Sequence, residues 1–241
     1  MNIPRPLEGE VHLYTLHLAR EAAELARLGQ LLAADETARA GLLKNDSAKN
    51  RFIAGRGILR EILGGYLYIE PADVLIATGE HGKPFLADCS NDLRFNLSHA
   101  DDLLVLAVAT GIEVGVDIEK VEADKPLVNM ARLVFSSKEQ EELLTLPTAR
   151  LQTVAFYRCW VRKEACLKAC GRGFSLPGNS FYISPLDEAT SLTGIRCNDI
   201  FWHVLDLDVP HHYCAALAVE NRIPTLPPLA FHVTAMQYPF R

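Results

Sequence analysis

The chain has 241 residues, which allows one large domain or two compact ones, each long enough to bury a core. Hydrophobic residues make up 49% and charged residues 22%, and these ordinary globular values exclude a disordered or fibrous chain. The formal net charge of -6 argues against a nucleic-acid partner held by bulk positive charge, so any anion must be bound locally.

The sequence carries no membrane signal. Its first residues lack an apolar segment, and the longest unbroken apolar run, residues 103–109, is far shorter than the ~18 residues of a membrane helix. We therefore expect a cytoplasmic protein without a membrane partner. The six cysteines form no CxxC pair, so we interpret them as reduced thiols rather than zinc ligands.

The first half of the chain predicts a strand, then helices, then further strands. The pattern predicts a strand over 11–18 and helices over 20–32, 35–44 and from Ser47, a candidate cap, to the Gly64-Gly65 pair. Short β-like runs follow over 74–78, 93–97 and 103–110, separated by turn-rich stretches.

The second half repeats this order. The pattern predicts a strand over 113–121, helices over 127–134 and 149–170, a helix opened by the capping box Ser136-x-x-Glu139, and strands over 181–184, 201–207 and 213–219. Helices followed by strands, twice, predict an α+β protein of two units, 1–112 and 113–241.

Two stretches are locally basic although the chain is acidic. Residues 39–60 and residues 150–172 each hold six basic residues and one acid. They could bind a polyanion that bridges the two units, or they could be solvated helix faces, and charge alone favours the second interpretation.

Two carboxylates lie on one face of a predicted strand in Gly115-Val116-Asp117-Ile118-Glu119. Alternation along a strand points Asp117 and Glu119 to the same side, where they favour a cation, while the opposite side is apolar. The alternative is an exposed edge of an ordinary strand.

The segment 156–177, FYRCWVRKEACLKACGRGFSLP, contains the strongest local signal. On a helix, Trp160, Glu164 and Lys168 follow one another at i, i+4 and i+8 and share one face. The alternative is a stabilising Glu-Lys pair with Trp160 in the core.

Ser98 and His99 follow the predicted strand that ends at Leu97. No G-x-S-x-G elbow surrounds Ser98, which excludes a common serine-hydrolase arrangement, whereas a hydroxyl and an imidazole suit a phosphate contact. Taken singly, a histidine in this position is more often structural. Lys83, in Gly82-Lys83-Pro84, is expected at a turn.

Taken in order, these pieces resemble the Sfp-type 4'-phosphopantetheinyl transferases. The resemblance rests on Arg51 in a helix, GKP at 82–84, FNLSH at 95–99, GVDIE at 115–119 and the segment 156–177. It implies a pseudodimer of two similar α+β halves that works as a monomer and binds coenzyme A and Mg²⁺ between the halves.

The resemblance also implies an activity and a set of roles. The expected reaction moves the phosphopantetheine arm of coenzyme A to a serine of an acyl or peptidyl carrier protein and releases 3',5'-ADP. Asp117, Glu119 and Glu164 are expected as metal ligands, and Glu164 and Lys168 as catalytic residues. The expected contacts to coenzyme A are Arg51, Lys83, Ser98, His99 and Lys168.

Two alternatives remain at this point: a Mg²⁺-dependent hydrolase of coenzyme A or a related nucleotide, and a non-catalytic module that binds coenzyme A or a carrier. A carrier surface is expected on the helix 127–134, the segment 136–146, or a helix face around Arg158 and Arg162.

Overall fold

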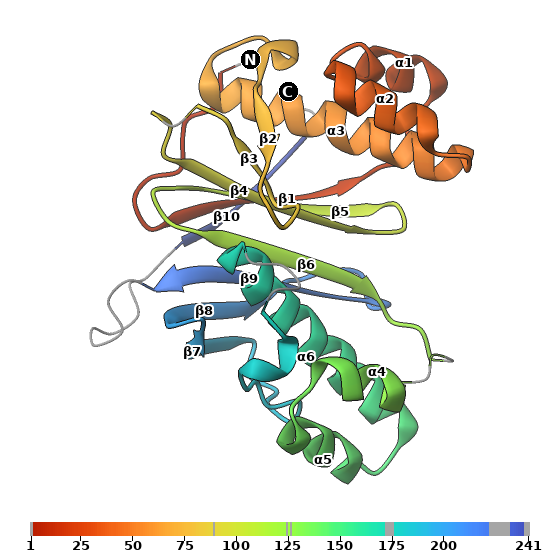
Figure 1. The fold of residues 1–241 in the computed structure, drawn as a ribbon, viewed down its shortest axis with the longest axis vertical. Coiled ribbons are helices and arrows are strands. Elements are labelled where there is room, and N and C mark those ends of the chain that lie inside the picture. Colours follow the sequence, from red (N-terminus) through yellow and green to blue (C-terminus); the bar gives the residue numbers. More distant parts are fainter. Residues whose placement is uncertain are drawn as a thin grey trace.

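The computed structural model describes residues 2–88, 90–123, 125, 127–171, 176–221 and 232–238, without the side chain of Val128. Figure 1 shows helices at both ends of the long axis and strands between them. Three hydrophobic clusters hold this arrangement together: one between the first helices and the first sheet, one between the two sheets, and one between the second helices and the second sheet.

The first half supplies a small hairpin and three strands of a four-stranded sheet. Its elements are β1 (Glu10–His17), α1 (Ala22–Gly29), α2 (Ala34–Leu42), α3 (Asp46–Leu67), the hairpin strands β2 (Ile76–Thr78) and β3 (Pro84–Leu86), β4 (Leu93–Ala100) and β5 (Leu103–Thr110). The strand order of the large sheet is β10-β1-β5-β4, in which β10 (His232–Met236) comes from the second half of the sequence.

The second half builds the other four-stranded sheet, in the order β6-β9-β8-β7. Its elements are β6 (Val114–Lys120), α4 (Leu127–Val134), α5 (Ser137–Thr145), α6 (Ala149–Cys170), β7 (Ser191–Cys197), β8 (Ile200–Asp206) and β9 (Tyr213–Asn221). The last strand, β10 (His232–Met236), instead pairs in parallel with β1 in the first sheet.

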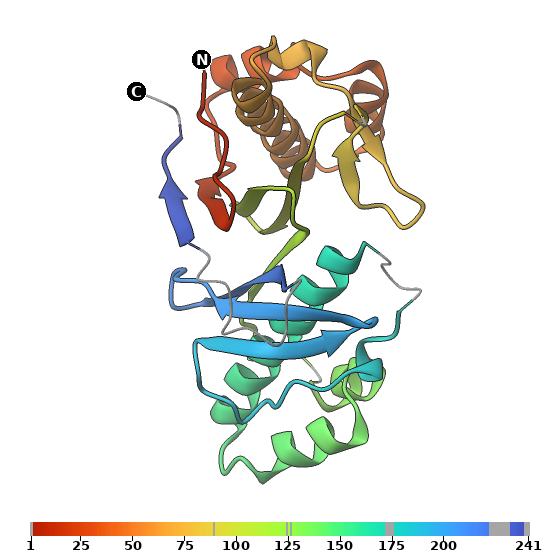
Figure 2. The same cartoon turned by 90° about the vertical axis from the view of Figure 1, so that its left-hand side faces the viewer.

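Both halves share one topology, which confirms the predicted pseudodimer of two α+β halves. Each starts with a strand, continues with two short helices and a 22-residue helix, and returns with strands. In each half the first strand pairs antiparallel with a strand that follows the long helix: β1 pairs with β5, and β6 pairs with β9. Figure 2 shows α6 behind the second sheet, covering one face of it.

Local signals set the ends of the long helices. The Thr148 side chain accepts a hydrogen bond from the Leu151 N–H at the start of α6, and Gly171 ends the helix with φ 68°. At the start of α3 the cap is Asn45, whose side chain accepts from the Ala48 N–H. The expectation of Ser47 as the cap was therefore wrong.

One predicted strand does not form. Residues 181–184 form no strand, and side chains bind two of their backbone groups. The Lys163 ammonium donates to the Phe181 carbonyl at 2.5 Å, and the Ile183 N–H donates to Glu139 Oε1 at 2.7 Å. Strands β7 and β10 were not predicted.

Both basic stretches include buried ion pairs. Arg60 binds Glu36 at 2.6 Å, Lys163 binds Glu139 at 2.6 Å, and Arg162 binds Asp206 at 2.7 Å, and all three cations are buried. These cations hold elements together, so neither a polyanion site nor a solvated helix face describes them. The expectation of an exposed carrier surface at Arg162 was wrong.

Candidate active site between the two halves

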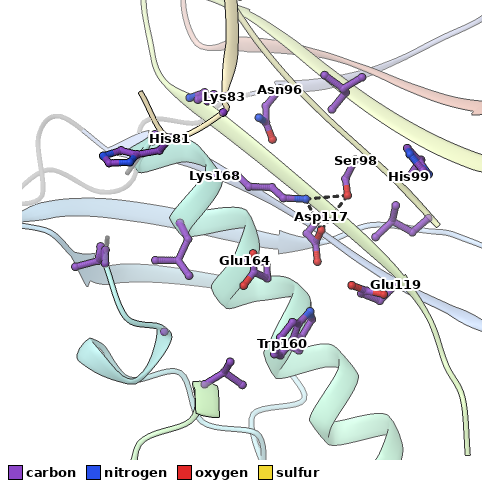
Figure 3. Close-up of a pocket in the computed structure, with 18 of the residues that line it drawn as sticks. His81, Lys83, Asn96, Ser98, His99, Asp117, Glu119, Trp160, Glu164 and Lys168 are labelled. Atoms are coloured by element: carbon purple, nitrogen blue, oxygen red, sulfur yellow. Dashed lines mark hydrogen bonds and ion pairs between the residues drawn. The ribbon is translucent and has the colours of Figure 1, made fainter. Parts of the chain in front are cut away.

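A cleft of about 720 Å³ opens where the two halves meet. The β2–β3 hairpin and β4 of the first half form one wall, and β6, α4 and α6 of the second half form the other. Seven of the eight sequence-predicted site residues line it: Lys83, Ser98, His99, Asp117, Glu119, Glu164 and Lys168. Figure 3 shows Ser98 of β4, Asp117 of β6 and Lys168 of α6 meeting in the cleft, with Lys83 above them on the β2–β3 hairpin.

Two close contacts bring these elements together. The Val116 N–H on β6 donates to Asn96 Oδ1 on β4 at 2.8 Å, which joins the edges of the two sheets. On the other side of β6, Gly115 lies directly against the backbone of α6 at Ala165 and Ala169. Asn96 was not predicted as a site residue, although it lies in the FNLSH motif.

Asp117, Ser98 and Lys168 form a connected cluster at the centre of the cleft. The Lys168 ammonium donates to Asp117 Oδ1 at 2.6 Å and to Ser98 Oγ at 2.9 Å, and Ser98 Oγ donates to the same Asp117 oxygen at 2.9 Å (Figure 3). Asp117 is only 3% exposed, so the alternative of an exposed strand edge was wrong.

Glu119 and Glu164 lie beside this cluster in the cleft. Burial, followed by the charge of Asp117, raises the pKa of Glu119 and of Glu164 above the usual value, while Lys168 opposes both shifts. Trp160 also lines the cleft, so its side chain belongs to the site as well as to the hydrophobic cluster around α6.

The donor set suits a small, hard cation. In the described residues no three Asp, Glu, His or Cys side chains already form a metal cage. Mg²⁺ needs less, since it usually takes one or two carboxylates and fills its other positions with water and substrate phosphates. Asp117 Oδ2 is buried and has no hydrogen-bond partner, which is the state expected of an oxygen that a cation would satisfy. The residues therefore fit the ion.

His99 lies on β4 and Arg51 on α3, and Arg51 is absent from the cleft lining. Burial, and then the positive charges of Arg51 and Lys168, lower the pKa of His99. The Arg51 guanidinium faces the β4–β5 turn, 3.8 Å from the carboxylates of Asp101 and Asp102. Ser98 and His99 are part of β4, which extends to Ala100 rather than ending at Leu97.

Lys83 joins the two halves. Its ammonium donates to Glu113 Oε2 at 2.8 Å, to the Ala169 carbonyl near the end of α6 at 3.0 Å, and to the Val114 carbonyl at 3.4 Å. Glu113 also binds Arg94 at 3.0 Å. The hairpin lysine thus fixes the first half against the end of the helix that carries Lys168.

Comparisons with known proteins agree with this geometry. A family model described as the 4'-phosphopantetheinyl transferase superfamily matches residues 113–218, and one described as 4'-phosphopantetheinyl transferase, N-terminal, matches residues 20–111. The 4'-phosphopantetheinyl transferase HetI of Nostoc sp. is 38% identical over 228 residues, which cover 91% of this chain and 93% of the relative.

Two further relatives are similar over less of their length. A phosphopantetheinyl transferase of Thraustochytrium sp. is 32% identical, covering 83% of this chain and 74% of its own. The 4'-phosphopantetheinyl transferase Sfp of Bacillus subtilis is 33% identical, covering 56% and 58%.

Proposed function

We propose how this cleft works on the basis that the chain belongs to the 4'-phosphopantetheinyl transferase superfamily. The protein transfers the 4'-phosphopantetheine arm of coenzyme A to a carrier protein. We assign a serine hydroxyl of an acyl or peptidyl carrier as the acceptor and 3',5'-ADP as the leaving group. The observation that carries the assignment is buried Asp117, with Oδ2 unpartnered, beside Lys168 in the cleft.

Asp117, Glu119 and Glu164 would hold Mg²⁺. When bound, the ion would draw negative charge from the phosphates and offset the mutual repulsion of the three carboxylates. Support comes from the unpartnered Asp117 oxygen and from the raised pKa of Glu119 and Glu164, which burial and Asp117 cause.

In the reaction, the serine oxygen bonds to the phosphorus that carries pantetheine, and the bond from this phosphorus to the bridging oxygen breaks with its electron pair leaving on 3',5'-ADP. Glu164 accepts the serine proton as the general base. Lys168 offsets charge on the pyrophosphate. One unit charge at 4 Å contributes about 4 kcal/mol at an effective dielectric near 20.

Coenzyme A would extend from this centre toward the first half. Ser98 and His99 would contact its phosphates from β4, and Arg51 would reach the distal 3'-phosphate from α3, since its charge already acts on His99. Lys83 would contribute from the hairpin after giving up part of its binding to Glu113. Most of the rate enhancement would come from the positioning of the substrates and from electrostatic stabilisation of the phosphate charges.

Intact-protein mass spectrometry tests the proposal. A purified apo carrier incubated with coenzyme A, Mg²⁺ and the protein should gain the mass of one phosphopantetheine group. Glu164→Gln, which keeps the shape but removes the base, should lose transfer. Cleavage of coenzyme A without a gain on the carrier would instead support a hydrolase. The absence of both products would contradict transfer and is the result expected of a non-catalytic binding module.

We also propose that the protein acts as a monomer in the cytoplasm, with no membrane or nucleic-acid partner. Support for the monomer is that one chain supplies both walls of the cleft. In the described part of the chain, no helix is both long enough and apolar enough to cross a bilayer. Sedimentation at micromolar concentration tests the monomer.

A further inference from the structure

Negative charge exceeds positive charge in the described lining of the cleft. Three carboxylates line it: Asp117, Glu119 and Glu164. Two lysines also line the cleft. Lys83 binds Glu113, whereas Lys168 binds Asp117, one of the three carboxylates. One ammonium offsets one of three negative charges, so a divalent cation would balance the remainder.

Lys168 and Asp117 differ in their freedom to move. The side chain of Asp117 is 5% exposed and is fixed on a central part of β6, whereas the Lys168 side chain is 31% exposed and reaches in from the open cleft. A buried carboxylate needs a partner, and this ammonium is the charged partner that the structure gives it. Lys168 can turn away toward solvent or a phosphate, while Asp117 stays in place.

We propose that Lys168 is the resident counter-ion of Asp117 in the ligand-free protein, that it competes with the divalent cation for this carboxylate, and that cation binding releases it to the pyrophosphate. The inference rests on the proposed function, in which the cleft binds both groups. Ser98 keeps its hydrogen bond to Asp117 Oδ1 when Lys168 leaves, which holds the carboxylate with Oδ2 toward the cation.

This exchange couples the two ligands. A pyrophosphate that attracts Lys168 leaves Asp117 without its counter-ion and so strengthens cation binding, and by thermodynamic linkage the cation strengthens binding of coenzyme A by the same factor. The coupling passes through the protein, in addition to any direct contact between cation and phosphate.

The test is Mn²⁺ binding, used as a spectroscopic probe for Mg²⁺ and measured by electron paramagnetic resonance without coenzyme A or carrier. Lys168→Met keeps the length of the side chain and removes its charge, so it should bind Mn²⁺ about tenfold more tightly than the wild type. Lys168→Gln serves as a second neutral variant if the first does not fold.

Two control variants separate competition from other effects. Lys120→Met removes the same charge from a lysine that binds Asp101 outside the cleft lining, and should leave Mn²⁺ affinity unchanged. Ser98→Ala removes a hydrogen bond to Asp117 without removing charge, and should not tighten Mn²⁺ binding.

A second titration with coenzyme A present measures the coupling, corrected for Mn²⁺ binding to coenzyme A alone. The wild type should gain more Mn²⁺ affinity from coenzyme A than Lys168→Met gains. Equal or weaker Mn²⁺ binding by both neutral Lys168 variants, or no Mn²⁺ binding by any form, overturns the inference. The mass of the carrier measures the transfer reaction separately, so failure of the proposed function can be distinguished from failure of this inference.

Discussion

Gly115 on β6 and Ala165 on α6 approach so closely that a Cβ atom on Gly115 would lie 2.1 Å from the Ala165 carbonyl oxygen. The backbone N–H of Ala169 would be only 2.4 Å away from the same atom. Any side chain at this position must push α6 off β6. Because β6 carries Asp117 and α6 carries Lys168, this contact sets the distance between these two side chains.

Gly115→Ala should therefore reduce both stability and transfer. Overpacking of this kind typically costs 1–3 kcal/mol, and backbone atoms cannot yield as a side chain does, so we expect a loss of about 3 kcal/mol in the free energy of unfolding in urea. Gly41→Ala is the control, because Gly41 is an exposed helical residue with no atom near its Cβ position. The control should be neutral or slightly stabilising.

Arg162→Glu should unfold the protein rather than alter carrier docking. Arg162 is 1% exposed and binds Asp206 through two nitrogens, with further hydrogen bonds to the carbonyls of Asp187 and Ala189. Removing one partner of a buried pair costs about 3–5 kcal/mol, and reversal costs more. Thermal melting should show this, with Arg150→Glu, exposed on the same helix, melting like the wild type.

The carrier is expected to dock on α4 at the mouth of the cleft. Leu133 is 78% exposed and also lines the cleft, so an apolar surface lies next to the candidate site. Leu133→Glu should raise the KM for the carrier about tenfold, equal to ~1.4 kcal/mol, without changing the KM for coenzyme A. Leu42→Glu, at an 81% exposed leucine on α2, is the control. Equal carrier kinetics for both variants would move the docking surface elsewhere.

The distal phosphate of coenzyme A tests the roles of Arg51 and His99. Arg51→Ala and His99→Ala should each weaken coenzyme A binding by about tenfold or more, since a hydrogen bond to a charged group contributes roughly 1.5–3 kcal/mol. Isothermal titration with dephospho-coenzyme A, which lacks the 3'-phosphate, provides the comparison. If a variant loses equal affinity for both compounds, that residue does not contact the 3'-phosphate.

Stability should fall as the pH drops below about 7, partly because of His12. Burial lowers the pKa of His12 below its ordinary value of 6.5, despite the opposing charge of Glu10. Between the unfolded and folded pKa values the unfolded chain binds more protons, so the free energy of unfolding decreases with decreasing pH. His12→Gln should show a smaller loss in Tm between pH 7.5 and 5.5, whereas His17→Gln, at an exposed histidine, should match the wild type.

Elements governed by local pattern could be predicted from the sequence. The bounds of β5, α4 and α6 match their apolar periodicity and caps, and the Ser136–Glu139 capping box is formed. The candidate site could be predicted from the sequence for the same reason. A spacing of two residues on a strand places Asp117 and Glu119 on one face, and a spacing of four on a helix does the same for Glu164 and Lys168. These relationships do not depend on how the strand and the helix pack in the fold.

Features that depend on distant partners could not be predicted. Arg162 is 44 residues from Asp206 and Lys163 is 24 from Glu139, so charge alone made both look solvated. Strand β7 was not predicted because Gly194, at φ 71°, interrupts the alternation of apolar and polar side chains between Leu192 and Ile195. The contact of Lys83 with the end of α6 spans 86 residues.

The parallel pairing of β10 with β1 makes the protein an internal strand donor. Five residues of β1, Glu10 to Tyr14, match His232 to Met236, so a segment from the end of the chain closes an edge at its beginning. If the connection between β5 and β6 were severed, the later fragment would still hold the earlier one through this strand, as swapped subunits hold each other. Residues 1–112 produced alone would instead present a bare β1 edge, which is a template for pairing with foreign chains.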